Sequence, residues 1–568
     1  MKEAIQQLVK AALQTLVDSG EFAELTIPEI KLDRTRDATH GDYASNIALA
    51  LAKQVGVKPR ELAENIIAAL PHNTCIKHIE IAGPGFINFF LAQATQMEIV
   101  ETVLSQASTY GHNSAGQDSK GNAQAVQVEF VSANPTGPLH VGHGRGAAVG
   151  DSICRLFEAT GWAVTREFYY NDAGQQINNL ATSVSLRCQG IGPDDERWPT
   201  DGYRGGYIVE LAQAYMNGES IGNVKGAADP TNDEAIRHFA VAYLRQEQDS
   251  DLRAFDVSFD VFSLESALYA EGKVEQVVEQ LTDNGLTYEK DDALWLKTTD
   301  FGDDKDRVMR KSDGSYTYFV PDVAYHRDKW QRGFKKVVNE QGADHHSTIT
   351  RVRAGLQGLD IGIPKNWPDY VLHQMVTVMK NGEEVKISKR AGSYVTLRDL
   401  IDQTGTDATR FFLVARRADS QLTFDIDLAL QKSNENPVYY IQYAHARICS
   451  AIANAMQKYE PWDKKQGLAH LDLLNAEHEI ELARLLASFP EKLASAASEL
   501  APHVIANYLR ELAAALHSWY ASGNQDKNLQ LLVADHTLRN ARLCLAEATR
   551  QVLANGLQLL GVSAPQKM

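Results

Sequence analysis

The spacing of apolar residues changes along the chain, and the first stretch has the period of an amphipathic helix. Residues 1–16 place apolar side chains at positions i, i+3, i+4 and i+7, which gathers them on one helix face. Residues 79–81 and 86–90 have the composition of two strands joined by the Gly-Pro-Gly turn at 83–85. We expect a small additional α+β domain over residues 1–108.

A second pattern begins after residues 109–124, a polar linker rich in Gly, Ser, Asn and Gln. Residues 125–131 form an apolar run that leads through a Pro- and Gly-rich loop into a helical stretch at 146–160. Strand, glycine-containing loop and helix in this order begin a parallel, Rossmann-like α/β nucleotide-binding domain. Further strands are expected at residues 319–320, 336–338 and 370–372. We place this domain at 125–400, with a helical insertion at about 180–290 and a connecting stem at 401–436.

After Pro437 the strand patterns stop. Long stretches rich in Ala, Leu, Glu and Arg follow to the end, with interruptions expected near Pro461, Pro490, Pro502 and Gly523. Residues 437–568 are therefore expected to form an all-α helical bundle. The predicted fold class is α/β, with smaller domains at both ends of the central one.

Composition and charge limit the kind of protein this can be. A chain of 568 residues, 44% hydrophobic and 23% charged, has the composition of a soluble multidomain protein. No apolar run is long enough for a membrane span, and the N-terminus lacks a signal-peptide pattern. The five cysteines are scattered without a CxxC pair, so neither a thiolate zinc site nor a disulfide framework is expected. A reducing cytoplasm is the expected location.

The net charge of −17 argues at first against a nucleic-acid partner. The charge is uneven, however. Residues 430–568 carry 13 Lys or Arg and 13 Asp or Glu, so the excess negative charge lies upstream. Neutrality of the tail does not by itself indicate RNA binding.

Two histidines stand where the first strand gives way to a helix, in the sequence Pro138-Leu-His140-Val-Gly142-His143. A helix N-terminus offers free N–H groups and partial positive charge to a phosphate. Glycine allows close approach of a nucleotide, and two imidazoles can donate to phosphoryl oxygens. A structural turn, a dinucleotide-binding loop and a two-histidine metal site are the alternatives. The last lacks a third ligand nearby.

A second candidate motif is the basic loop Lys386-Ile-Ser388-Lys389-Arg390. Two ammonium groups three residues apart can reach the β- and γ-phosphates of ATP, and Ser388 adds a hydroxyl donor. A solvated basic loop is the alternative.

Taken together, in this order and on either side of an insertion, the two motifs resemble the paired signature of class I aminoacyl-tRNA synthetases. Four further segments narrow the resemblance to the arginyl-tRNA synthetase family, namely residues 129–140, 318–326, 342–346 and 561–568. The resemblance covers nearly the whole chain. Ile387 and Arg390 stand where the class usually has Met and Ser, but both lysines and Ser388 remain.

The resemblance implies a carbon–oxygen ligase. Such an enzyme activates L-arginine with ATP to arginyl-adenylate and pyrophosphate, and then transfers arginine to the 3′-terminal adenosine of tRNA(Arg). ATP is a substrate accompanied by Mg²⁺, with no metal held by the protein itself. We expect a monomer with no membrane attachment.

The resemblance also assigns residues to the amino acid. A guanidinium is planar and always charged, so its pocket needs carboxylates and flat acceptors. Asp322 is the expected guanidinium partner, with Tyr318 beside it, and Asn134 would orient the α-amino or carboxylate end. Glu129 ends a buried strand, where a bare charge is costly and a ligand cation would relieve the cost. The full expected set is Glu129, Ser132, Asn134, Tyr318, Asp322 and Tyr325.

For ATP, the resemblance implies that Asp344 accepts from ribose hydroxyls and that the backbone at Met375 and Val376 pairs with adenine. The expected ATP-binding set is Pro138, His140, Gly142, His143, Gly342, Asp344, His345, Met375, Val376, Lys386 and Lys389. The expected catalytic set is His140, His143, Lys386, Ser388 and Lys389.

For tRNA, aromatic side chains can stack on splayed bases and arginines can meet phosphates. Core packing is the competing interpretation for each aromatic residue. Phe86 and Asn88 match a family position at the tRNA elbow. The expected set is Phe86, Asn88, Tyr443, Arg447, Trp519 and Tyr520.

Two other functions remain to be weighed. A non-catalytic tRNA-binding relative would have lost the histidines or lysines of the two motifs, and all four are present. A nicotinamide-dependent dehydrogenase built on the glycines near residue 142 would leave the lysine loop and the helical tail without a role.

Overall fold

The computed structural model describes residues 2–20, 22, 25–35, 37–172, 174–385, 394–459 and 461–568. They form two compact units. Unit 1 comprises residues 1–107, 451–487 and 515–551, and unit 2 comprises residues 108–450, 488–514 and 552–568.

The N-terminal part of unit 1 is a small α+β layer. Its four antiparallel strands have the order β1-β2-β4-β3. Helix α1 is amphipathic and contributes Ile5, Val9 and Leu13 to the same core as Ile87 and Phe89 of β4. The predicted helix and both predicted strands are confirmed. The elements are α1 (Lys2–Asp18), β1 (Asp33–Arg34), β2 (Tyr43–Ser45), α2 (Ile47–Val55), α3 (Pro59–Ala68), β3 (Ile76–Ala82), β4 (Phe86–Leu91) and α4 (Gln93–Gln106).

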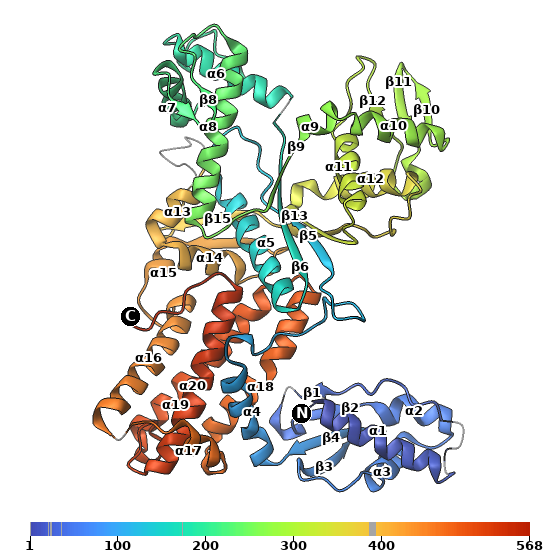
Figure 1. Ribbon diagram of the computed structural model, residues 1–568, viewed down its shortest axis with the longest axis vertical. Helices are drawn as coiled ribbons and strands as arrows, with labels where there is room; N and C mark the ends of the chain where they lie inside the picture. Colours follow the sequence, from blue (N-terminus) through green and yellow to red (C-terminus); the bar gives the residue numbers. More distant parts are fainter. Residues whose placement is uncertain are drawn as a thin grey trace. The chain divides into compact units, whose positions relative to one another are not determined.

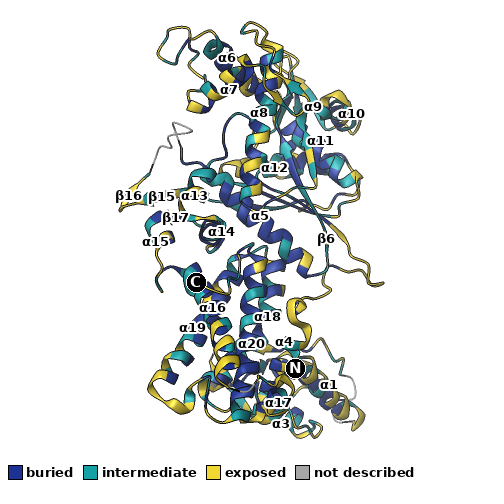
Figure 2. Cartoon of the chain, turned by 60° about the vertical axis from the view of Figure 1, so that its left-hand side comes forward, coloured by how far each residue is buried: buried dark blue, intermediate teal, exposed yellow. Residues whose placement is uncertain are grey.

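Unit 2 is built on a five-stranded parallel sheet of order β14-β13-β5-β6-β9. The strands are β5 (Ala125–Glu129), β6 (Ala163–Tyr170), β9 (Val261–Leu264), β13 (Lys336–Gly342) and β14 (Asp369–His373). Helix α5 (Val141–Ala159) follows β5 and is buried along most of its length (Figure 2). Gly150 permits this packing, because a Cβ there would overlap the ring of Phe130. The predicted parallel α/β core is confirmed.

Three helices form a separate cluster between β6 and β9: α6 (Gln175–Cys188), α7 (Gly206–Met216) and α8 (Asp233–Ala254). Figure 1 shows them grouped apart from α9, α10, α11 and α12 of the same unit. Strand β9 lies within the range expected as one insertion, 180–290, yet it returns to the central sheet. A second excursion follows it, with α9 (Glu265–Ala270), α10 (Lys273–Asp283) and the sheet β10 (Thr287–Lys290), β11 (Ala293–Leu296) and β12 (Arg307–Arg310).

The prediction of a strand at residues 319–320 is wrong. Both residues begin helix α11 (Phe319–Gln331). Phe319, Val320, Val323 and Ala324 are buried at helical spacing, and a two-residue apolar run cannot distinguish the two periods. Unit 2 continues with α12 (His346–Gly358), β15 (Val376–Lys380), β16 (Glu383–Glu384), α13 (Leu397–Thr404), α14 (Thr406–Val414), β17 (Leu422–Asp425) and α15 (Ile426–Leu430).

The C-terminal region is helical, as predicted. Its elements are α16 (Pro437–Lys458), α17 (Lys464–Ala469), α18 (Glu477–Ser498), α19 (His503–Gln525) and α20 (His536–Leu559). The interruption expected near Pro490 is wrong, because α18 runs through this residue. Phe489 and Leu493 beside it are fully buried, so packing outweighs the local cost of proline in a helix.

Candidate active site

The candidate site lies where the order of strands reverses. β5 is followed across the sheet by β6 and β9, whereas β13 lies on its other side and leads to β14. Open α/β sheets bind ligands outside the carboxyl ends of the two strands at such a switch point. Glu129 ends β5, and Gly342 ends β13. The residues expected to bind arginine and those expected to bind ATP therefore start from the same edge of the sheet.

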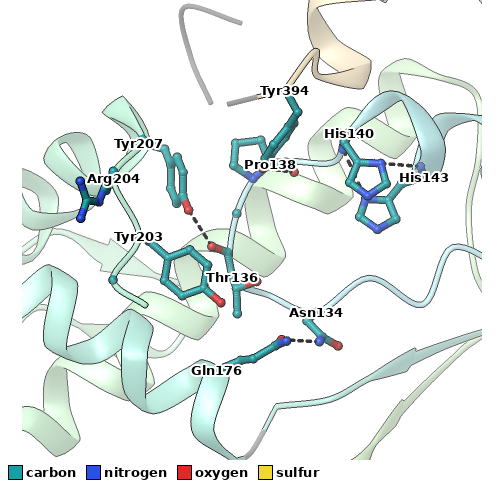
Figure 3. A pocket seen from close by; sticks show the side chains of 13 residues that line it. Asn134, Thr136, Pro138, His140, His143, Gln176, Tyr203, Arg204, Tyr207 and Tyr394 are labelled. Atoms are coloured by element: carbon teal, nitrogen blue, oxygen red, sulfur yellow. Dashed lines mark hydrogen bonds between the residues drawn. The ribbon is translucent and has the colours of Figure 1, made fainter. Parts of the chain in front are cut away.

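His140 and His143 cap helix α5 reciprocally. His140 Nδ1 accepts the backbone N–H of His143 at 3.1 Å, and His143 Nδ1 accepts the backbone N–H of His140 at 3.3 Å (Figure 3). The two rings are stacked, with their centroids 3.5 Å apart. Because both Nδ1 atoms accept, each neutral ring carries its proton on Nε2, the atom that can donate to a phosphoryl oxygen.

Both imidazoles are neutral at pH 7. Burial, together with the neighbouring His373, lowers the pKa of His140 to about 4. Burial, and then the proximity of His140 and His373, holds the pKa of His143 well below its ordinary value. The start of α5 therefore offers neutral side-chain donors beside the N–H groups of a helix N-terminus.

A pocket of about 580 Å³ lies beside these histidines (Figure 3). One wall is the loop from Asn134 to Pro138, the opposite wall comes from the α6–α8 cluster, and Tyr394 closes a third side. Its lining residues are Asn134, Thr136, Gly137, Pro138, His140, His143, Gln176, Gly202, Tyr203, Arg204, Gly205, Tyr207 and Tyr394.

Backbone hydrogen bonds join the start of α5 to residues 395–397, about 250 residues further along the sequence. Val141 donates its N–H to the carbonyl of Val395 at 3.0 Å, and Leu397 donates to the carbonyl of Leu139 at 2.8 Å. This bridge pairs His140 with Thr396 and anchors the chain just beyond the lysine motif at the start of α5. The predicted catalytic residues Lys386, Ser388 and Lys389 themselves lie outside the described residues.

Glu129 has a partner within the protein. Its Oε2 accepts from the fully buried Lys329 Nζ at 2.6 Å, and its Oε1 accepts from Ser132 Oγ at 2.9 Å. Lys329 Nζ also donates to Asn339 Oδ1 at 3.0 Å. The sequence-based reason for a ligand cation at Glu129 was an uncompensated buried charge. Lys329 already supplies that compensation, so the assignment of Glu129 to arginine stays a prediction without that reason.

Asp322 is the acid whose charge is least compensated. It lies in the first turn of α11, and its side chain is 38% exposed. Although the side chain is partly exposed, the surrounding protein removes enough water from its carboxyl group, with added repulsion from Glu129 and Glu265, to raise its pKa to about 7. Lys329 offsets only part of this rise. A cationic ligand here would restore the charged carboxylate, and a guanidinium has the matching geometry.

Glu265 completes the acidic group, and sequence reasoning missed it. It begins α9, directly after β9, and Tyr169 donates its hydroxyl to Glu265 Oε2 at 2.9 Å. Burial raises the pKa of Glu265 as well. Recognising 261–264 as a strand of the parallel sheet would have placed this acid at a strand end.

The backbone between β5 and the pocket is strained. Val131 and Ser132 both have positive φ, 67° and 41°, a conformation that is costly for a β-branched residue such as valine. The turn brings Ser132 Oγ to Glu129 and lets it accept the N–H of Tyr169 at 3.2 Å. The strained turn therefore directs the hydroxyl of Ser132 onto the carboxylate of Glu129, and both residues are predicted to bind arginine.

The other predicted arginine residues differ in their surroundings. Asn134 lines the pocket, where its Nδ2 donates to Gln176 Oε1 at 2.6 Å. Tyr318 is 82% exposed at the N-terminus of α11. Tyr325 is buried, and its hydroxyl donates to Glu167 Oε1 at 2.9 Å. The hydroxyl of Tyr325 is thus used inside the protein.

The residues expected to hold the nucleoside lie at the ends of β13 and β14. Asp344 and His345 form the short helix after Gly342, with the His345 Nε2 atom 3.6 Å from Asp344 Oδ2. Both side chains are well exposed. Met375 is also exposed, and Val376 begins β15. Pro138 and Gly142 flank His140.

A buried acid–histidine pair beneath α5 was also missed. His373 Nδ1 lies 2.5 Å from Glu340 Oε1, and attraction from Glu340 raises the pKa of His373 against the opposing effect of burial. Both residues end or nearly end parallel strands, so the register of β13 and β14 would have been the signal. Arg145 of α5 is buried beside them and donates to three backbone carbonyls, those of Gln374, Arg417 and Ser420.

The predicted tRNA residues divide into surface and core. Arg447 donates to the Tyr443 hydroxyl at 2.9 Å and lies over its ring on the half-buried face of α16. Phe86 is exposed, whereas Asn88 is buried within its sheet. Trp519 is buried too, with its indole N–H on the carbonyl of Leu529 at 3.0 Å. Tyr520 is half-buried. Burial removes the surface argument for Asn88 and Trp519.

The described part of the chain shows neither a metal-binding cluster nor a membrane-spanning helix. No group of three or more His, Cys, Asp or Glu side chains there could hold a metal ion. Within the same residues, every helix is too short or too polar to cross a membrane.

Known families match nearly the whole chain. The arginyl tRNA synthetase N terminal domain matches residues 3–91, the catalytic domain of the class I tRNA synthetases (R) matches 101–433, and the DALR anticodon binding domain matches 441–568. The chain belongs to the arginyl-tRNA synthetase family. The resemblance, the fold class and the enzyme class expected from the sequence are confirmed.

Individual members of the arginyl-tRNA synthetase family agree with this over their full length. The arginine–tRNA ligases of Geobacter metallireducens and Geotalea daltonii are each 57% identical to the chain, over 574 and 573 residues and all of both chains. The Thermus thermophilus arginyl-tRNA synthetase superposes with a TM-score of 0.74 at 22% identity, covering 100% of each chain, and so shares the fold.

Proposed function

We propose that the protein joins arginine to the 3′-terminal adenosine of tRNA(Arg) in two steps at the carboxyl ends of β5 and β13. The observation that carries this proposal is the meeting of two charge environments at one sheet edge. Neutral imidazole donors stand at a helix N-terminus, and an acidic group around Asp322 lies at the ends of the neighbouring strands. One suits a triphosphate and the other a guanidinium.

Arginine binds with its guanidinium on Asp322. Glu129 is neutralised by Lys329, so Asp322 and Glu265 supply the net negative charge that selects a cationic side chain. A planar guanidinium can donate two parallel hydrogen bonds to one carboxylate, which a Lys ammonium cannot match. Asn134, in the loop between β5 and α5, orients the α-amino or carboxylate end of the arginine. Ser132 holds the Glu129 carboxylate in place.

ATP binds with its phosphates at the start of α5. His140 and His143 donate Nε2–H to phosphoryl oxygens, and Lys386, Ser388 and Lys389 supply further donors to the β- and γ-phosphates. Gly342, Asp344 and His345 hold the ribose, and the backbone at Met375 and Val376 meets adenine. Pro138 and Gly142 leave room for the phosphates.

In the first step the arginine carboxylate attacks the α-phosphorus. An O–P bond to arginine forms, the bond to the β-phosphate oxygen breaks, and pyrophosphate leaves with the electron pair. Hydrogen-bond donors fixed before the reaction stabilise the developing charge on the phosphoryl oxygens. In the second step a hydroxyl of the terminal adenosine attacks the activated carbonyl, its proton is lost, and AMP leaves.

Mg²⁺ accompanies ATP and is held largely by the phosphates, as is usual for this ion. The tRNA contacts are Phe86 near the elbow and Tyr443, Arg447 and Tyr520 toward the anticodon. We further propose a monomer acting in the cytoplasm.

Aminoacylation tests the proposal directly. Purified protein with ATP, Mg²⁺ and tRNA(Arg) should form arginyl-tRNA, and no other member of a panel of twenty amino acids should replace arginine. ATP–pyrophosphate exchange with and without tRNA separates the two steps. The proposal would be refuted if protein that is folded, as shown by cooperative unfolding, formed no arginyl-tRNA at cytoplasm-like salt and pH.

A further inference from the structure

The loop between β5 and α5 makes few backbone hydrogen bonds, and within residues 134–138 the one recorded joins the N–H of Thr136 to the carbonyl of Asn134 at 2.8 Å. Pro135 and Pro138 lack an N–H, and the loop pairs with no strand between Asn134 and Pro138. Buried carbonyls must nevertheless be satisfied. In this loop the carbonyls of Asn134, Thr136, Gly137 and Pro138 accept from side chains of distant segments.

Three side chains supply these bonds. Gln248 Nε2 donates to the carbonyl of Asn134 at 3.0 Å and to that of Gly137 at 2.9 Å. The Tyr207 hydroxyl donates to the carbonyl of Thr136 at 2.9 Å, and the Tyr394 hydroxyl donates to that of Pro138 at 3.0 Å. A primary amide carries two hydrogens, so Gln248 can satisfy both of its carbonyls at once.

Each helix of the α6–α8 cluster takes part. Gln176 of α6 accepts from the Asn134 side chain, Tyr207 belongs to α7, and Gln248 belongs to α8 (Figure 3 shows the first two contacts). Gln248 and Tyr207 are only 1% and 4% exposed. A Cβ on Gly137 would meet both tyrosine hydroxyls at 3.0–3.1 Å, so the loop is closely enclosed on this side.

We propose that Gln248 and Tyr207 are positioning residues for the amino-acid site, and that the α6–α8 cluster sets the affinity for arginine through the loop 134–138. Gln248 fixes the main chain of Asn134 while Gln176 fixes its side chain, so the cluster determines where that amide points. The inference rests on the proposed role of Asn134 in arginine binding. It also gives a physical route by which any displacement of α6–α8 reaches the arginine site.

The test compares Gln248→Met and Tyr207→Phe with the wild-type protein. Methionine keeps the length of glutamine but donates nothing, and phenylalanine keeps the ring and loses only the hydroxyl. Gln246→Met is the matched control, because Gln246 lies on the same helix and is exposed. The arginine KM, the ATP KM, kcat and the midpoint of thermal unfolding are measured for each protein, and arginine binding is measured by calorimetry.

Gln248→Met leaves the Gly137 carbonyl without its side-chain donor and the Asn134 carbonyl with only the N–H of Thr136, at 2.8 Å. The arginine KM of this variant should rise about tenfold, and the loss of one donor should raise that of Tyr207→Phe a few-fold. The ATP KM should change less, and Gln246→Met should match the wild type. Unchanged arginine KM values in both variants would overturn the proposal. A lower unfolding midpoint with kinetic constants intact would do the same, since it would show a structural role alone.

A double-mutant cycle with Asn134→Ala tests the route. If Gln248 acts through Asn134, the effect of Gln248→Met on the arginine KM should largely disappear in the Asn134→Ala background. Additive effects would overturn the route through Asn134. Failure of the wild-type protein to charge tRNA would instead refute the proposed function. The wild-type aminoacylation assay is therefore done before any variant is measured.

Discussion

The proposed phosphate side and the proposed arginine side of the site are built in opposite ways. His140 and His143 are three residues apart on one helix start, cap each other and are neutral. The arginine side draws charged groups from β5, α9 and α11, and their charges are only partly balanced. The first side consists of two neutral residues that are close in sequence. The second side is assembled from segments far apart in sequence, and it keeps an excess of negative charge. The difference indicates that substitutions on the two sides should change different kinetic constants.

The largest expected effect is on the phosphate side. Replacing His140 by Asn keeps a good helix cap but removes the Nε2 donor. We expect kcat for adenylate formation to fall about 10²- to 10³-fold, the cost of losing one fixed donor to a developing oxyanion, with little change in the arginine KM. Steady-state ATP–pyrophosphate exchange at saturating arginine and ATP, with tRNA present, measures it. A comparable rise in the arginine KM would break the separation of the two sides.

On the arginine side, Asp322→Asn should raise the arginine KM about a hundredfold, because the guanidinium loses its charged acceptor. The ATP KM should stay nearly constant. The raised pKa of Asp322 shows that the fold disfavours its charged form, so the variant should not unfold at a lower temperature at pH 8. Asp360→Asn, at an exposed position with positive φ that asparagine tolerates, is the control. An unchanged arginine KM would show that Asp322 does not bind arginine.

The pH dependence should differ between the two sides. Asp322, facing Glu129, Glu265 and Lys329, has a pKa near 7, and bound arginine favours the carboxylate. Arginine therefore binds at full strength above pH 7 and more weakly below it, by about tenfold between pH 8 and pH 6. His140, with its pKa of about 4, contributes no titration in this range. Calorimetry over these pH values checks it, and the Asp322→Asn protein should give a flat profile.

The same contrast explains what could be predicted from sequence. The His140 motif and the strand before it are local, so their pattern predicted a strand, a loop and a helix in the right order, although α5 begins at Val141 and not at 146. The phosphate chemistry of the motif stays a prediction. The partner of Glu129 is Lys329, 200 residues away, and Glu265 follows a strand of four residues that no pattern distinguished. Residues 319–320 were predicted as a strand because two apolar residues cannot distinguish the period of a strand from that of a helix. The break at Pro490 was wrong because packing of its neighbours outweighed the local cost of proline. Charge balance in a pocket depends on which segments meet, and a single sequence does not contain that information in local form.

The smallest expected effect concerns the strained turn that joins the two sides. Val131→Gly relieves a left-handed conformation worth about 1–3 kcal/mol but gives the unfolded chain more freedom, at about 0.5–1 kcal/mol. The free energy of unfolding should therefore stay within about 1–2 kcal/mol of the wild-type value. Val126→Gly, in the extended and buried strand β5 that precedes the turn, should be clearly destabilising, since it removes a core side chain and gains no relief of strain. Thermal unfolding compares the two variants.

A freer turn also loosens Ser132 on Glu129, so the arginine KM of Val131→Gly should rise a few-fold while adenylate kinetics at saturating arginine stay unchanged. A drop in kcat at saturating arginine would mean that the turn also positions the phosphate side, and the two sides would then be one mechanical unit.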